Sequence, residues 1–145
     1  MIDRKALLSD LQDLLKSIEA DLIARSNLDD LPEVGDWLKA EYDRAKKAER
    51  TAHNYEDWLT DYVTQVAAAW VLSCVFVRFL EDNGLIDPPR ISGPGDRLKR
   101  ARDERVLFFR EHPTETDREY LLFVFGELAK LPGGEDLFGP HNILN

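Results

Sequence analysis

The apolar positions along the chain fall at helical spacings, and no useful stretch alternates with the period of two that marks a strand. The longest apolar run is residues 54–83, which contain no Gly or Pro and only four polar side chains between Tyr62 and Leu80. Asn54 can cap the start of a helix, and Gly84 can end it in the left-handed conformation. The run predicts a helix of about 30 residues, buried on nearly all sides.

A membrane-spanning helix would also be apolar over this length, so the polar residues decide between the two environments. Gln65 and Arg78 interrupt the run, and the flanks are acidic rather than basic. A spanning helix favours about 20 clean apolar residues with basic anchors on the cytoplasmic side. The pattern therefore favours the central helix of a soluble domain, without a membrane partner.

Four further segments carry helical patterns. Residues 3–26 place leucine and isoleucine at alternating spacings of three and four, like a short coiled-coil seam: Leu8, Leu11, Leu15, Ile18 and Leu22. This seam can pack inside its own domain or form a dimer interface. A second helix is predicted over residues 33–53, with a charged face rich in Lys and Arg. That face is either solvated or a binding surface.

The C-terminal half predicts two shorter helices. Asp96 is expected to cap a helix over residues 97–111, and Thr116 with Glu119 forms a capping box before a helix over residues 117–131. In the first of these, Arg105 falls within the apolar arc. Either Arg105 is partly buried and paired, or the helix is broken into two pieces.

The predicted fold class is all-α. We expect a single bundle-like domain of about five helices over residues 1–135, arranged around the apolar central helix 54–83. Residues 136–145 contain Gly, Pro and Asn without helical periodicity. They are predicted to be a connector that leaves the domain.

Composition and charge narrow the function classes. The net charge of −9 argues against a general nucleic-acid coat, and the single cysteine, Cys74, fits a reducing, cytoplasmic compartment without disulfides. Against this acidity, residues 90–110 hold seven bases and three acids. These bases are expected either to contact phosphate or an acidic partner, or to form ion pairs within the domain. The candidate contact residues are Arg90, Arg97, Lys99, Arg100, Arg102 and Arg105.

The sequence shows no catalytic, cofactor or metal site. His53, His112 and His141 are far apart, and no His or Cys lies at metal-ligand spacing. Asp87-Pro88-Pro89-Arg90 resembles the D/N-P-P-aromatic loop that holds a flipped adenine, but Arg90 replaces the aromatic residue and a helix precedes the loop. We therefore interpret it as a proline turn. Glu81 and Asp82 are adjacent at the C-terminal end of a helix, where the dipole disfavours them, and they are expected to take a partner there, Arg78 or a basic side chain across the loop.

Three blocks carry a family resemblance: TQVAAAWVLSCVFVRFLEDNGLI (64–86), SGPGDRL (92–98) and HPTETDREYLLFVFGELAKLPG (112–133). Together they resemble the N-terminal helical region of the PglX family, adenine-specific DNA methyltransferases of phage growth limitation and BREX (type 2) phage-defence systems. The resemblance implies that a catalytic domain using S-adenosylmethionine follows in the parent enzyme. None of that domain's motifs is present, so this chain alone is expected not to be an enzyme.

The resemblance implies a module that braces the catalytic domain and contacts DNA or a partner subunit. Its partners would be the remainder of the methyltransferase, and DNA or other defence-system proteins. Residues 136–145 would then lead toward the missing methyltransferase domain. The alternative is a stand-alone helical protein-protein interaction module, with a dimer through residues 3–26 as one form of it.

Overall fold

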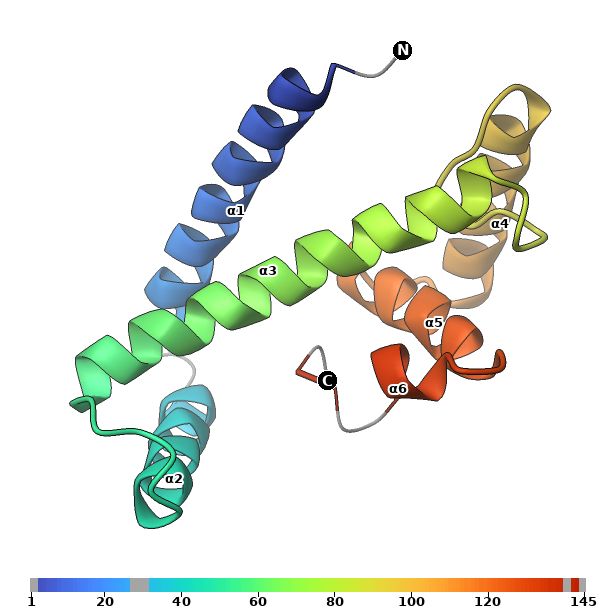
Figure 1. The fold of residues 1–145 in the computed structure, drawn as a ribbon. Helices are drawn as coiled ribbons and strands as arrows, with labels where there is room; N and C mark the ends of the chain where they lie inside the picture. Colours follow the sequence, from blue (N-terminus) through green and yellow to red (C-terminus); the bar gives the residue numbers. More distant parts are fainter. Residues whose placement is uncertain (1–2, 27–31, 140–141, 144–145) are drawn as a thin grey trace. The chain divides into compact units, whose positions relative to one another are not determined.

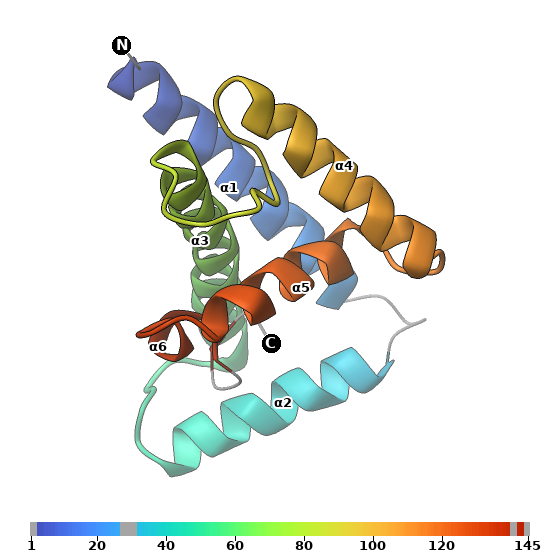
Figure 2. The ribbon, with the colours of Figure 1, turned by 90° about the vertical axis from the view of Figure 1, so that its right-hand side faces the viewer.

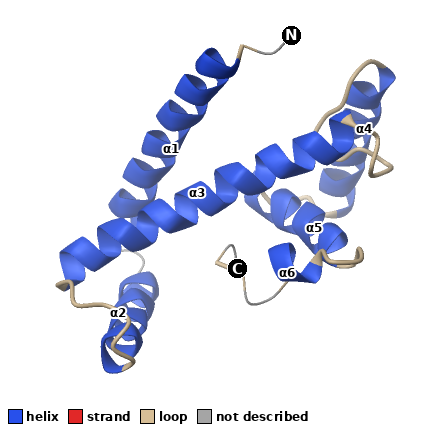
Figure 3. Ribbon diagram, viewed as in Figure 1, coloured by secondary structure: helices blue, strands red, loops and turns tan. Residues whose placement is uncertain are grey.

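The computed structural model describes residues 3–26, 32–139 and 142–143, and every regular element in them is a helix (Figures 1 and 3). The predicted all-α class is therefore confirmed. The helices are α1 (Arg4–Ser26), α2 (Pro32–Lys47), α3 (Tyr55–Asp82), α4 (Asp96–Glu111), α5 (Asp117–Ala129) and the short α6 (Glu135–Phe138).

The chain divides into two compact units, and the division falls within α3. Unit 1 is residues 1–71 and unit 2 is residues 72–145. Unit 1 holds α1, α2 and the first part of α3. Unit 2 holds the rest of α3 and the later helices, of which α4 and α5 are joined by a short turn (Figure 2). The expected domain of residues 1–135 with a connector over 136–145 stays a prediction.

The predicted boundaries of the apolar helix are confirmed by its caps. The Asn54 side-chain oxygen accepts the Asp57 N–H at 2.9 Å. At the other end, the Leu85 N–H donates to the Leu80 carbonyl at 2.9 Å, and Gly84 has a φ of 67°. A residue with a side chain would be strained in that left-handed conformation, so Gly84 ends the helix where the sequence indicated.

The expectation that α3 is buried on nearly all sides is wrong. One stripe is buried, but Leu72 and Phe79 are 64% and 55% exposed. The stripe consists of Leu59, Val63, Ala67, Val71, Val77 and Glu81. By length and composition α3 is the one helix of the described residues that could cross a membrane, a test that the core helix of a soluble protein also passes.

Helix α2 ends earlier than its sequence pattern indicated, at Lys47 rather than residue 53. Glu49 adopts a φ of 55°, and the Arg50 N–H donates to the Ala45 carbonyl at 2.9 Å. This is the left-handed ending that glycine usually supplies. Because glutamate is a good helix former, local preference did not reveal it.

The core of unit 1 is a small cluster between α2 and α3. Leu38, Leu59 and Val63 are buried, and five partly buried side chains pack against them: Leu22, Ile23, Tyr55, Trp58 and Tyr62. Of the α1 seam, only its last residue, Leu22, joins this cluster. No residue of α1 is buried, and Leu8 is 57% exposed. Packing of the seam inside unit 1 is thus limited to its C-terminal end.

Helix α4 is continuous, and its N-cap differs from the predicted one. Gly95 occupies the cap position without a side-chain hydrogen bond, and Asp96 is the first helical residue. The predicted Asp96 cap is therefore wrong, although its carboxylate still lies in the positive first turn. Arg105 is half-exposed and ion-paired with Asp117 at 2.5 Å, over the Phe109 ring. Pairing, not a break in the helix, accommodates its charge.

The first part of the C-terminal tail packs within unit 2. Phe138 of α6 is buried, and its ring stacks on Phe125 at 5.3 Å between centroids and on Phe76 at 6.2 Å. These contacts stabilise α6 although the tail shows no helical periodicity. His141 lies outside the described residues.

The capping box of α5 yields a pH-dependent stability prediction. The Thr116 hydroxyl and N–H donate to the Glu119 carboxylate, which lowers its pKa from 4.5 to about 2. A depressed pKa stabilises the fold at neutral pH, and this contribution is lost as the pH falls from about 4.5 to about 2.

We expect Thr116→Ala to lower the free energy of unfolding at pH 7 by about 1 kcal/mol, and the difference from wild type to shrink toward pH 2. Urea unfolding at several pH values measures this. Thr116→Ser keeps the hydroxyl and is the control. A Thr116→Ala penalty that is independent of pH would contradict this account of Glu119.

Candidate contact surface and the loop that positions it

A buried carboxylate at the end of α3 organises the loop that leads to α4. Glu81 is 0% exposed. Its oxygens accept the backbone N–H groups of Arg90 at 2.5 Å, Ile91 at 2.8 Å and Ser92 at 2.7 Å. A buried carboxylate must be fully hydrogen-bonded, and here backbone donors supply the bonds. The expectation of a basic partner is therefore wrong for Glu81, but it is confirmed for Asp82, which pairs with Arg78 at 3.0 Å.

Arg90, a residue of this loop, also ties the loop to α4 and α5. Its guanidinium pairs with Glu104 of α4 and lies 5.4 Å from the centroid of the Phe123 ring of α5. Its carbonyl accepts the Tyr120 hydroxyl at 2.7 Å. Burial, above all, raises the pKa of Tyr120 to about 12, so this hydroxyl keeps its proton. Residues 90–92 thus link α3, α4 and α5 within unit 2.

The proline turn contributes one carboxylate that fixes the start of α4. Asp87 accepts two hydrogen bonds from Arg100, both at 2.9 Å, and one from Arg97 at 3.2 Å. The hydrogen bond from Arg100 is the main cause that holds the pKa of Asp87 below its ordinary value. Arg97 also donates to the Ile86 carbonyl at 2.5 Å. The acid of the Asp87–Arg90 motif therefore serves as an anchor.

These contacts divide the six candidate residues into two groups. Four make ion pairs within unit 2: Arg90 with Glu104, Arg97 and Arg100 with Asp87, and Arg105 with Asp117. For Lys99 and Arg102, the described part of the chain offers no ion pair. Both are exposed on α4. The structure thus assigns four of the six bases to the fold and leaves two available for an external contact.

The two available bases belong to one exposed row of α4, which we call the α4 outer face. It consists of Lys99, Arg102, Val106 and Arg110, all exposed and spaced by three or four residues. Such spacing places side chains on one side of a helix. The face presents three positive charges around one apolar side chain, with the exposed carboxylate of Asp103 beside them, and its excess of positive charge suits phosphate or an acidic partner.

Metal-dependent and thiol chemistry find little support among the described residues. No group of three or more His, Cys, Asp or Glu among them could hold a metal ion. Cys74 is partly buried, and burial raises the pKa of its thiol. A thiol held neutral in this way is a poor nucleophile.

Comparison with known proteins identifies a relative of this chain. No family model matches the chain, and no solved structure matches it. A curated protein is 46% identical over 146 residues, which cover 99% of this chain and 12% of the relative. The chain is therefore a helical relative of one segment of an adenine-specific methyltransferase. That methyltransferase is PglX of Streptomyces coelicolor. The resemblance to PglX drawn from the three sequence blocks is confirmed, and this chain spans about an eighth of its relative's length.

The Glu81 hydrogen bonds give a stability prediction. Glu81→Gln replaces one accepting oxygen by an NH₂ group, which leaves at least one buried loop N–H without a partner. We expect the free energy of unfolding to fall by about 1–3 kcal/mol. Amide hydrogen exchange at Arg90, Ile91 and Ser92 should become faster, and denaturant unfolding gives the energy.

The matched control is Glu111→Gln, an exposed glutamate on α4. That change should alter stability by no more than about 0.5 kcal/mol. Equal effects of the two substitutions would show that the buried carboxylate does not hold the loop.

Proposed function

We propose that this chain is the N-terminal, non-catalytic helical module of an S-adenosylmethionine-dependent, adenine-specific DNA methyltransferase in a BREX-type phage-defence system. One observation carries the proposal: the chain matches PglX over 99% of its own length but only 12% of its relative's. Catalysis and binding of the methyl donor then belong to the parts of the parent enzyme outside this match. The module works in the cytoplasm, where DNA is the parent's substrate.

The module has two roles in this proposal. Its helices brace the catalytic domain, and the α4 outer face contacts DNA or a partner subunit. The chain as a whole carries a net charge of −9, so contact with an anion needs a local surface of opposite sign. Lys99, Arg102 and Arg110 provide one.

The ion pairs around Asp87 support this role because they fix α4 on its own loop. Phosphate contacts position a protein on DNA without reading its sequence, and each contact releases counterions. The α4 outer face would thus help to orient the catalytic domain, while sequence recognition lies elsewhere in the parent.

A second candidate is a stand-alone interaction module that dimerises through α1. The observation in its favour is that α1 has no buried residue and exposes Leu7, Leu8 and Leu14. Two heptads make a short seam, but a coiled-coil dimer would cover these leucines. Light scattering of the chain in dilute solution separates the two candidates, because a monomeric mass would exclude the dimer through α1.

The contact surface is tested by reversing two of its three bases. In the parent enzyme, we expect Lys99→Glu with Arg102→Glu to lower DNA affinity about tenfold or more. The slope of log affinity against log salt concentration should fall by about 2, because two phosphate contacts are lost. Titration of labelled duplex DNA at several salt concentrations measures both.

The control makes the same charge change on α1, with Arg4→Glu and Lys16→Glu, two exposed bases outside the α4 outer face. It should leave the salt slope unchanged. If the α4 variant binds DNA and partner subunits as wild type does, the proposed contact is wrong. The four paired bases are left intact so that the fold is preserved.

A further inference from the structure

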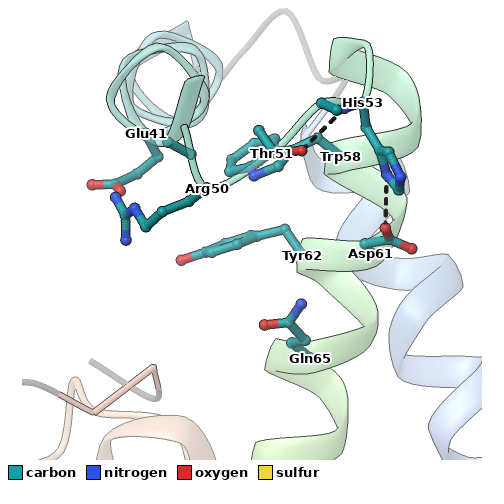
Figure 4. Close-up of a pocket in the computed structure, with 10 residues that line it drawn as sticks. Glu41, Arg50, Thr51, His53, Trp58, Asp61, Tyr62 and Gln65 are labelled. Atoms are coloured by element: carbon teal, nitrogen blue, oxygen red, sulfur yellow. Dashed lines mark hydrogen bonds and ion pairs between the residues drawn. The ribbon is translucent and has the colours of Figure 1, made fainter. Parts of the chain in front are cut away.

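Unit 1 contains an open cavity that plays no part in the function proposed above. It has a volume of about 430 Å³ and lies between the end of α2, the link that follows it, and the first turns of α3 (Figure 4). This volume falls in the range of small-molecule sites in proteins. All of its lining residues lie between Glu41 and Gln65.

One wall of the cavity is aromatic. The rings of Trp58 and Tyr62 stack with 5.0 Å between centroids and 19° between planes, and Tyr55 continues the stack behind Trp58. Figure 4 shows the Tyr62 ring projecting into the open space. Burial, and then the charge of Glu41, raises the pKa of Tyr62, so the phenol is neutral. The stack supports Tyr62 as a rigid, flat surface.

Two polar side chains lie on either side of that ring. Figure 4 shows Arg50 on one side of Tyr62 and Gln65 on the other. Within the described residues, neither side chain makes a hydrogen bond or an ion pair. The two carboxylates of the lining are already engaged, Asp61 with His53 at 3.2 Å and Glu41 with Arg44. The guanidinium of Arg50 is therefore the charge available to a ligand.

These groups match the chemistry of an unpaired nucleotide. An aromatic face stacks any base, a guanidinium binds phosphate, and a carboxamide can face the donor and acceptor atoms of a base edge. An aromatic peptide side chain would use the stacking surface but would leave Arg50 without an anion.

We propose that this cavity binds one unpaired nucleotide of single-stranded DNA, with its base on Tyr62 and its phosphate at Arg50. Bases of an intact duplex are paired and stacked, so they cannot enter. This proposal rests on the proposed function in one respect: the ligand is taken to be DNA because the chain is proposed to be a module of a DNA methyltransferase. Its site lies in unit 1 and is distinct from the α4 outer face.

The test uses the 145-residue chain and a fluorescein-labelled, mixed-sequence DNA of about 12 nucleotides, as a single strand and as a duplex. Fluorescence anisotropy at low salt should show the single strand bound about tenfold more tightly than the duplex. Tyr62→Leu and Arg50→Ala should each weaken single-strand binding about tenfold, while Tyr62→Phe keeps the stacking surface and binds within about twofold of wild type.

The matched control is Arg4→Ala, the same change on α1 outside the cavity, which should bind like wild type. Arg50 is exposed, so Arg50→Ala tests the site even if Tyr62→Leu does not fold. Absence of single-strand binding, equal binding of duplex by the variant with Lys99→Glu and Arg102→Glu, or wild-type binding by Arg50→Ala would each overturn the proposal.

The two DNA proposals fail separately. If Lys99→Glu with Arg102→Glu removes single-strand binding and the cavity variants do not, the cavity is excluded and the α4 outer face remains. If the cavity variants alone lose single-strand binding, the cavity is the nucleotide site, whatever the α4 variant does to duplex affinity.

Discussion

The architecture of unit 2 depends on one buried carboxylate. Glu81 has no exposed surface and accepts three consecutive backbone N–H groups from residues 90–92. Those residues cannot turn away from α3 without stranding a charge in the interior, which is far costlier than any surface contact. With the loop fixed, Arg90 reaches Glu104 on α4, and its carbonyl meets the Tyr120 hydroxyl of α5. Three helices are thereby tied to one short segment.

This constraint explains how the basic segment divides into structural and available charges. Arg97 and Arg100 hold Asp87 at the start of α4, and Arg105 holds Asp117 at the start of α5. Lys99 and Arg102 remain on the outer side of a helix whose position is set by those pairs. The aromatic cavity of unit 1 is a separate feature, built on the Trp58 and Tyr62 stack. We propose that the two units handle DNA in different forms, duplex on α4 and an unpaired nucleotide in the cavity.

The helices and their caps could be read from the sequence where the signal is local. Asn54, Gly84 and the Thr116 and Glu119 pair act as their residue types indicate. The end of α2 could not be predicted from the sequence, because Glu49 adopts a left-handed backbone conformation that glutamate disfavours. The bonds of Glu81 and the ion pairs of Asp87 join residues about ten positions apart across a loop, which periodicity does not encode. The six basic residues were therefore found as a group, but their division required three-dimensional contacts.

The central claim is that this chain is one module of a larger adenine methyltransferase, and the size of the native gene product tests it most directly. An antibody raised against the 145-residue chain would be used to immunoblot lysate from cells that carry the gene. The account predicts a band far above 16.7 kDa, the mass of this chain. A band at 16.7 kDa without a larger species would contradict it and would favour a self-standing interaction module.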